Sequence, residues 1–336
     1  MSSNITQILP GLRRFTIPFP RDPRRNVNSF LFSVDGEALL LDASWDVPEA
    51  LESLETALEQ SGLGLQAVRT VLITHLHPDH LGLAGRLRKL GARVGYHPAE
   101  AMVLLTRFRR LAEFREHTLL WERLNGAPAE AESSFSNISG VEGSLGEAPH
   151  PDLPLEGGET VEIGDFRLRP VWTPGHTLGH LCFYEETRKL LFTGDHVLPT
   201  ISPHVGMYVH AIGNPLPNYL DSLTLLEAYH PDLVLGAHGE AFTDLHARLA
   251  ELLEHHHERM EEMFQIVGGE PLTAWGVASR AHWTRRKVGL DQIAPQHRRL
   301  ALAETIAHLE LLRAEGRLVK EFAPGRMLYK RVLSQV

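Results

Sequence analysis

Cysteine is almost absent from this sequence. Cys182 is the only cysteine among 336 residues, so no disulfide can form within the chain and a cysteine-ligated iron–sulfur centre is excluded. It lies in the apolar stretch 181–184, which has the composition of a strand. We therefore expect a buried, chemically inert thiol.

Long apolar stretches are missing as well. No run approaches the roughly 18 residues that span a bilayer, and residues 1–4 lack the basic region and apolar core of a signal peptide. With 43% hydrophobic and 22% charged residues, the composition is ordinary for a globular protein. These features predict a cytoplasmic protein without a membrane partner.

Charge is present but unevenly distributed. The chain carries a net charge of −9, yet residues 270–336 contain twelve Lys and Arg against six Asp and Glu, a net charge of +6 that leaves −15 for the rest. Gly268, Gly269 and Pro271 interrupt two helical patterns between these parts. We therefore predict two domains, a catalytic domain over 1–267 and a small C-terminal domain over 268–336.

Strand and helix patterns alternate in the first part of the chain. Residues 30–34 and 38–42 are apolar runs joined by an Asp35-Gly36 turn, which predicts a β-hairpin. Four further elements are expected in order: a helix over 48–60, a strand over 71–73, a helix over about 83–90 and a strand over 93–96. This order is typical of an α/β domain.

Residues 100–132 interrupt the alternation with a long helical pattern rich in apolar residues and arginines. We interpret this segment as a helical insertion. Two roles stay open for it: it covers core, or it forms a lid that shapes a substrate site, as long insertions in compact domains often do. Residues 133–158, rich in Ser, Gly and Pro, are expected to form a loop that returns to the sheet.

The segment 74–80 concentrates residues that bind metals. His75, His77, Asp79 and His80 follow a buried strand and precede a helix, so they lie on a strand-to-helix turn of the kind that presents side chains to ligands in α/β sheets. In an extended segment alternate side chains point the same way, so His75 and His77 can reach one ion. Asp79 and His80 lie beyond the turn and favour a second ion.

Three more ligand types follow apolar strands further along the chain. His176 lies in a Pro-Gly turn, Asp195 follows Gly194, and His238 stands beside a glycine. The recurrence argues against the alternative of surface histidines on a loop. We predict that His75, His77 and His176 bind one metal ion, that Asp79, His80 and His238 bind a second, and that Asp195 bridges the two.

This ligand set predicts hydrolytic chemistry. Zinc favours imidazole and carboxylate ligands, and catalytic zinc sites keep a position open for water. Two ions about 3.5–4 Å apart acidify a shared water into a hydroxide nucleophile and polarise the bond to be cleaved. Asp79 is the expected catalytic residue, which orients the hydroxide or takes its proton. We expect two divalent ions per chain, zinc first, with iron and manganese as alternatives.

The sequence His75-Leu76-His77-Pro78-Asp79-His80, followed by His176, Asp195 and His238, resembles the five-motif pattern of the metallo-β-lactamase superfamily over roughly residues 5–265. The resemblance implies an αβ/βα sandwich with a dinuclear site at one edge, between two sheets. His80 combined with Asp195 resembles the glyoxalase II-like and ribonuclease-like branches and makes antibiotic hydrolysis less expected. One departure is Ala43-Ser44 after Asp42, where the family often has glycine.

Other histidines are weaker candidates. His255, His256 and His257 are consecutive on a charged helical stretch, point in different directions and are expected on a solvated face. His196 and His204 follow Asp195 closely, and each is a candidate for lining the pocket. Tyr219 either faces substrate or begins a helix and packs.

The basic C-terminal segment has its own pattern. Helices are expected over 272–280 and 298–315, and strands over 316–322 and 326–330 around an Ala-Pro-Gly turn. Helices followed by a hairpin resemble a small winged-helix domain. Packing against the catalytic domain or dimerisation is the favoured role, and nucleic-acid contact is the alternative. We expect a homodimer.

These expectations converge on a metal-dependent hydrolase that cleaves a small acyl substrate: a thioester, an ester or a lactone. The first alternative is a phosphodiesterase or ribonuclease that uses the same ions and holds RNA on the winged helix. A second is a non-enzymatic DNA-binding regulator, which the intact ligand set argues against. Iron-based redox chemistry is a third, and no part of the sequence supplies an electron-transfer domain for it.

Overall fold

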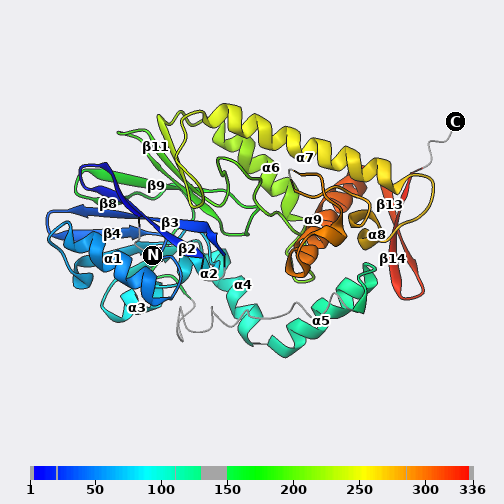
Figure 1. Ribbon diagram of the computed structural model, residues 1–336, viewed down its shortest axis with the longest axis horizontal. Helices are drawn as coiled ribbons and strands as arrows, with labels where there is room; N and C mark the ends of the chain where they lie inside the picture. Colours follow the sequence, from blue (N-terminus) through cyan, green and yellow to red (C-terminus); the bar gives the residue numbers. More distant parts are fainter. Residues whose placement is uncertain (1–3, 20–21, 110, 130–149, 285, 333–336) are drawn as a thin grey trace. The chain divides into compact units, whose positions relative to one another are not determined.

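The computed structural model describes residues 4–19, 22–109, 111–129, 150–284 and 286–332. In it the apolar runs of the N-terminal part form a seven-stranded sheet in the order β1-β2-β3-β4-β5-β6-β7. Figure 1 labels β2, β3 and β4 of this sheet. Strands β1 to β4 pair antiparallel, and β4 to β7 pair parallel. The strands are β1 (Asn4–Leu9), β2 (Leu12–Phe19), β3 (Asp22–Val34), β4 (Glu37–Leu41), β5 (Val68–Leu72), β6 (Arg93–Tyr96) and β7 (Leu153–Pro154).

A second sheet has five strands in the order β12-β11-β10-β9-β8. It is also mixed, because β11 and β12 pair parallel while the other neighbours pair antiparallel. Its strands are β8 (Val161–Ile163), β9 (Phe166–Trp172), β10 (Leu181–Glu185), β11 (Leu190–Gly194) and β12 (Leu233–Gly236). Two mixed sheets with helices agree with the expected α/β class.

The two sheets share a core because successive side chains of a strand point to opposite faces. Phe30, Phe32, Leu39 and Leu41 of the first sheet belong to one buried cluster with Phe192 and other residues of the second. Aromatic edge contacts join the sheets: the rings of Phe30 and Phe192 lie 5.0 Å apart. The alternate positions of the first sheet, such as Leu31 and Leu40, belong to a second cluster with the helix α1 (Pro48–Glu59). Burial on both faces explains why β4 is almost entirely apolar.

The chain divides into two compact units. Unit 1 comprises 1–108, 137–203 and 225–249, and unit 2 comprises 109–136, 204–224 and 250–336, counted over the described residues. Short helices of unit 1 are η1 (Leu65–Ala67), α2 (Pro78–Leu81) and α3 (Ala84–Lys89). A boundary between the two units falls within each of three helices, so that each has residues assigned to both: α4 (Pro98–Arg109), α6 (Pro215–Leu226) and α7 (Leu245–Val267). The division at residue 267 stays a prediction.

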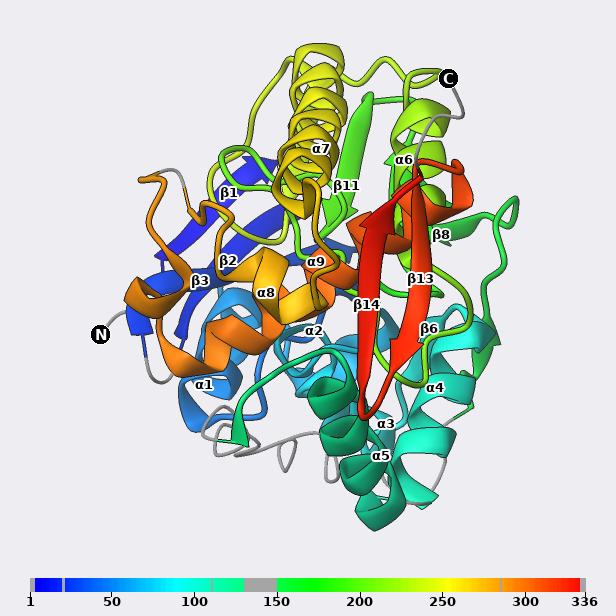
Figure 2. The ribbon, with the colours of Figure 1, turned by 90° about the vertical axis from the view of Figure 1, so that its right-hand side faces the viewer.

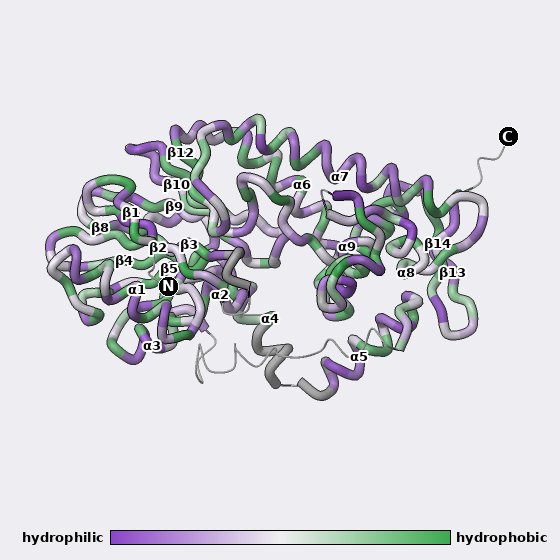
Figure 3. The backbone as a smooth tube through the Cα atoms, viewed as in Figure 1, coloured by the Kyte–Doolittle hydropathy of each residue, from purple (hydrophilic) through white to green (hydrophobic). Residues whose placement is uncertain are grey.

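Unit 2 contains the C-terminal elements and the end of the helical insertion. Its remaining elements are α5 (Leu111–Leu124), α8 (Ala274–Ala278), η3 (Leu290–Gln292), α9 (Pro295–Ala314), β13 (Leu318–Ala323) and β14 (Arg326–Arg331). Strands β13 and β14 form an antiparallel hairpin, coloured red in Figure 2. Along α7 the tube of Figure 3 alternates between polar and apolar colours, as expected for a helix with one buried face. Within the described residues, no helix combines the length and apolarity needed to cross a membrane.

Most expected elements are present, with small shifts at their ends. The hairpin over 30–42 and the helix that starts at Pro48 are confirmed. The long helical pattern expected over 100–132 contains two helices, α4 and α5, within its described residues. The short strand β7 was missed, because two residues in a segment rich in Pro and Gly carry no periodicity. The expected loop over 133–158 lies partly outside the described residues. Cys182 is fully buried, and burial raises the pKa of its thiol to about 12, which confirms an inert cysteine.

Backbone strain accumulates where β4 ends. Asp42 and Ser44 have φ angles of 51° to 57°, in the left-handed region that disfavours side chains. Ser44 is fully buried, and its Oγ has no hydrogen-bond partner among the described residues. It therefore combines an unfavourable φ with an unsatisfied hydroxyl.

We expect Ser44→Gly to raise the free energy of unfolding by about 1 kcal/mol, because glycine accepts a positive φ and removes the buried hydroxyl. Denaturant titration of both proteins measures the change. Ser279→Gly, at an exposed position with negative φ, is the control and is expected to be neutral or destabilising. A less stable Ser44→Gly protein would contradict this interpretation.

Candidate metal centre

The candidate ligands stand where strands of both sheets end. Strand β5 ends at Leu72 just before His75, β11 ends at Gly194 just before Asp195, and β12 ends at Gly236 just before His238. Strand β9 ends at Trp172 and leads into the turn that carries His176. All of these residues belong to unit 1.

Proline explains how one short segment serves two clusters. His77 is the N-cap of α2 and is still extended, with φ −75° and ψ 151°, whereas Pro78 occupies the first helical turn. Proline is pre-organised for that position. Asp79 and His80 therefore lie on the helix, and their side chains point in another direction from those of His75 and His77. This is the arrangement that the strand-to-helix turn in the sequence predicts.

The first cluster consists of His75, His77, His176 and Asp195. Three ring nitrogens converge: His77 Nδ1 lies 2.8 Å from His75 Nε2 and 3.1 Å from His176 Nε2. Oδ2 of Asp195 lies 3.6 Å from His176 Nε2. The pKa of His75 is well below its usual value, because of burial first and then the neighbouring imidazoles, so that ring is neutral and offers a lone pair.

The second cluster consists of Asp79, His80 and His238. Oδ2 of Asp79 lies 3.8 Å from His80 Nε2 and 3.5 Å from His238 Nε2. The other oxygen of Asp195, Oδ1, lies 3.6 Å from His80 Nε2 and 3.1 Å from His238 Nε2. Asp195 thus presents one carboxylate oxygen to each cluster, which is the geometry of a bridging ligand.

These spacings fit bound metal ions. Four ligands about 2.0–2.1 Å from a tetrahedral zinc ion stand roughly 3.3 Å from one another. The separations given above run from 2.8 to 3.8 Å, and all ligand atoms of a cluster lie within 4.8 Å of one another. Moreover, within the part of the chain that the structure describes, His80 Nε2 and Asp195 Oδ1 are buried polar atoms without a hydrogen-bond partner. Buried polar atoms of this kind need a ligand. The structure therefore supports a dinuclear metal site without identifying the metal.

A second layer of contacts orients the ligands. Oδ2 of Asp42 accepts a hydrogen bond from His80 Nδ1 at 2.8 Å, which leaves Nε2 facing the cluster. Asp42 is held in turn by the backbone N–H of Thr74 at 2.8 Å. The backbone carbonyl of Asn26 accepts from His238 Nδ1 at 2.5 Å. Burial alone would lower the pKa of His80, but Asp42 and the other nearby carboxylates outweigh it and raise the pKa well above its usual value.

We expect Asp42→Asn to weaken binding of one of the two metal ions about 10–100-fold, the usual effect of removing an outer-shell partner. The amide keeps the volume of the side chain but can present an N–H to His80 Nδ1, which then turns the wrong tautomer toward the metal. Competition with a chelating dye measures the affinity. Asp46→Asn, on the same loop and paired with Arg86 at 2.6 Å, is the control. Equal affinities for both variants would refute the role of Asp42.

Two further residues lie near the centre that were not predicted as metal ligands. Asp42 follows an apolar strand, as Asp195 does, and that signal could have identified it. His180 is fully buried, and its Nε2 accepts the backbone N–H of Asp195 at 3.2 Å while its Nδ1 lies 2.9 Å from Thr173 Oγ1. Gly194 is required beside it, because a Cβ there would lie 2.8 Å from the ring of His180.

The three other pocket candidates, His196, His204 and Tyr219, contact neighbouring protein side chains. His196 is fully buried with its ring 5.5 Å from that of His180. His204 belongs to unit 2, where its Nε2 lies 2.7 Å from the hydroxyl of Tyr208. Tyr219 is buried inside α6 and packs against His256, 5.2 Å between ring centroids.

The expected solvated face is wrong for His256, which is 1% exposed. Its Nδ1 lies 3.1 Å from Nε2 of His308 on α9. The error arose because consecutive helical residues point in different directions: His257 is exposed, while the residue before it faces the core.

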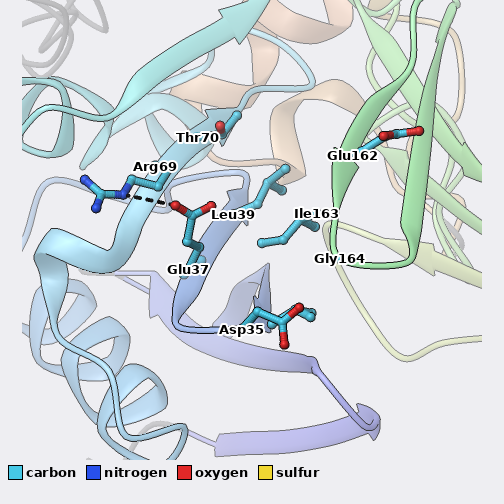
Figure 4. Close-up of a pocket in the computed structure, with 10 residues that line it drawn as sticks. Asp35, Glu37, Leu39, Arg69, Thr70, Glu162, Ile163 and Gly164 are labelled. Atoms are coloured by element: carbon cyan, nitrogen blue, oxygen red, sulfur yellow. Dashed lines mark ion pairs between the residues drawn. The ribbon is translucent and has the colours of Figure 1, made fainter.

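A separate cavity of about 440 Å³ lies where strands β4 and β5 begin, whereas the candidate ligands follow the ends of strands. Its lining includes Asp35, Leu39, Ile163 and Gly164, and Figure 4 shows these residues with Glu37 paired to Arg69, 3.6 Å apart. It contains none of the seven candidate ligands. Because β4 begins at this end and leads to Asp42 at the other, the cavity is remote from the metal centre.

Comparison with known proteins decides the family. The model of the metallo-beta-lactamase superfamily matches residues 22–238, which include all seven candidate ligands. The chain belongs to the metallo-beta-lactamase superfamily. Two solved structures of this superfamily resemble the whole chain. A metallo-beta-lactamase family protein from Thermus thermophilus is 34% identical with a TM-score of 0.79, and 97% of this chain and 100% of that chain are covered.

The other solved structure, a beta-lactamase domain protein from Burkholderia ambifaria, is 29% identical with a TM-score of 0.82, over 98% of this chain and 94% of that one. Among curated proteins, the probable metallo-hydrolase YqjP of Bacillus subtilis is 24% identical over 89% of this chain and 92% of its own length. The lactamase-like protein nscB of Aspergillus fumigatus is 25% identical over 79% of this chain, and the match spans only 63% of that relative.

Proposed function

We propose that this metallo-beta-lactamase superfamily member is a dinuclear metal-dependent hydrolase of a small acyl substrate: a thioester, an ester or a lactone. The observation that carries the proposal is the pair of His/Asp clusters joined by Asp195, whose two carboxylate oxygens face different clusters. The similarity to a probable metallo-hydrolase over almost the whole chain supports it.

Bound metal ions would supply an acidified water and polarise the substrate carbonyl. The residues of the chain hold the reacting centre in place. The imidazoles of His75, His77 and His176 face the first cluster, and those of His80 and His238 face the second, so that their ring nitrogens would hold one ion on each side. Asp79 stands between the second pair with one carboxylate oxygen near both rings, where it can hold a proton released by the water. Zinc is the metal we propose.

The alternative, phosphodiester or RNA cleavage, has less support from the C-terminal hairpin. Its basic side chains are largely engaged within unit 2: Lys320 pairs with Glu310, Lys330 with Glu321, and Arg317 with Glu261, each at 2.7 Å. Charges neutralised in this way contribute little to phosphate binding. We therefore propose a structural or dimerising role for this winged-helix-like segment. The 73% exposed Phe322 on β13 is consistent with such an interface.

A substrate panel tests the proposed function. The metal-loaded protein is assayed against an acyl thioester, a lactone, a phosphodiester, a cephalosporin and single-stranded RNA, with Asp79→Asn as the matched inactive control. We expect turnover of the acyl compounds alone. RNA cleavage that is abolished in Asp79→Asn and weakened in the Arg326→Gln/Lys330→Gln double variant would instead establish the ribonuclease alternative. Light scattering of the same sample measures whether the protein is the proposed homodimer.

A further inference from the structure

Glu100 is a buried acid that is not one of the seven candidate ligands. It lies in the first turn of α4 and is only 3% exposed. Its two carboxylate oxygens accept hydrogen bonds from two different segments of the chain: Oε2 from the backbone N–H of Leu76 at 3.0 Å, and Oε1 from that of Gly179 at 2.6 Å. Residues 76 and 179 are far apart in sequence, so this carboxylate joins two loops.

Both loops carry metal ligands. Leu76 stands between His75 and His77. Gly179 is three residues after His176 and directly precedes His180, whose ring accepts the backbone N–H of Asp195. The first metal cluster takes its imidazoles from these two loops, and His77 Nδ1 and His176 Nε2 must stay about as close as the observed 3.1 Å to share one ion.

The contact is built into the backbone. A Cβ at Gly179 would lie 2.8 Å from Cγ of Glu100, so only glycine lets the loop come this close. The φ angle of Gly179 is not in the positive range, so close approach, rather than backbone conformation, requires glycine here. A second set of contacts joins the start of α4 to the loop that contains Gly179. The ring of His97, just before α4, stacks on that of Trp172 with 5.0 Å between centroids, and the indole N–H of Trp172 donates to the carbonyl of Leu178 at 3.0 Å.

We propose that Glu100 is a positioning residue for the metal centre. Its carboxylate fixes the spacing between the loop that carries His75 and His77 and the loop that carries His176. Each oxygen satisfies one buried N–H, and neither loop can move away without leaving that donor unpaired, which is unfavourable in a buried site. Ligands held in this way bind their ion without first having to be ordered.

Glu100→Gln tests this role with little change in volume. Glutamine has one carbonyl oxygen and one NH₂ group, so one of the two backbone N–H groups must face another donor. We expect metal affinity to fall about 10–100-fold and kcat to fall with it, while KM changes less than about threefold. Affinity is measured by competition with a chelating dye, which needs no substrate. The matched control is Glu59→Gln, at an exposed position of α1, which should leave affinity unchanged.

Gly179→Ala disturbs the contact between Glu100 and Gly179 by adding a methyl group at position 179. We expect it to weaken metal binding as well. In the double variant with Glu100→Ala, the added methyl has more room, so the combined loss should be smaller than the product of the single losses. A purely structural role of Glu100 would lower the melting temperature of the metal-free protein and leave the affinity of the folded protein within about twofold of wild type. That result would overturn the proposal.

The inference rests on the metal centre of the proposed function but not on its substrate. If the chain binds metal and Glu100→Gln weakens that binding, the positioning role stands even when no acyl compound is turned over. If acyl compounds are hydrolysed and the Glu100→Gln affinity is unchanged, the positioning role fails while the proposed function stands. The two outcomes are therefore distinguishable.

Discussion

Replacing Asp195 with alanine is expected to reduce metal binding at both clusters and to remove activity. Its carboxylate faces His176 with one oxygen and His80 and His238 with the other. Nearby His238 and His80 hold the pKa of Asp195 well below its usual value although burial opposes this, so the group is a carboxylate at neutral pH. Removing it would take one candidate ligand from each cluster and would leave the three imidazoles of the first cluster without the carboxylate of that cluster.

The expected loss of metal affinity exceeds about 100-fold, because even an outer-shell partner accounts for 10–100-fold. Elemental analysis after gel filtration measures the retained metal. Asp232→Ala, an exposed aspartate whose only described ion pair is with Lys189 at 3.7 Å, is the control. A protein that keeps two ions without Asp195 would show that this residue does not bridge.

Asp79→Asn is expected to lower kcat/KM by about 10²–10⁴, the range typical of a lost general acid or base. The amide oxygen can still face the second ion, but the side chain no longer accepts a proton. The fold should be preserved, because Asp79, although buried, belongs to neither apolar cluster of unit 1.

Circular dichroism and metal analysis of Asp79→Asn separate loss of chemistry from loss of metal or fold. Metal content close to wild type with much lower turnover is the expected combination. Turnover within twofold of wild type would remove Asp79 from the mechanism, and loss of one ion would limit its role to that of a ligand.

The local motif could be predicted from sequence because it depends on short-range geometry. His75 and His77 alternate in an extended segment, and Pro78 starts a helix that turns Asp79 and His80 away. The three distant ligands could be predicted because each follows an apolar strand, and strand ends of two packed sheets meet at one edge. The structure brings all seven together as expected.

Residues that act through other residues could not be predicted in the same way. Glu100 sits in an ordinary helical pattern, and its partners are backbone N–H groups that look the same at every position of a sequence. The place of Asp42 after an apolar strand marks it as a candidate, but its contact with His80 depends on a left-handed backbone conformation that no periodicity reveals. Both follow from tertiary packing, which propensity and pattern do not encode.

The same limit applies to the helices of unit 2. The helices and hairpin of the C-terminal segment were predicted from periodicity and turn residues. The pairing of His256 with His308 and the engagement of Lys320 by Glu310 were not, because they depend on how α7, α9 and β13 pack together. These contacts weaken the case for nucleic-acid binding by the basic segment, because several of its basic side chains form ion pairs within unit 2.

The most direct test of the account is the metal content of the purified protein after reconstitution with zinc and removal of excess ion. Two tightly bound ions per chain are predicted, falling by at least one in both His77→Ala and His238→Ala, which each remove a ligand from a different cluster. A wild-type protein that retains one ion or none, or one whose metal content is unchanged by these substitutions, would contradict a dinuclear centre built from these seven residues.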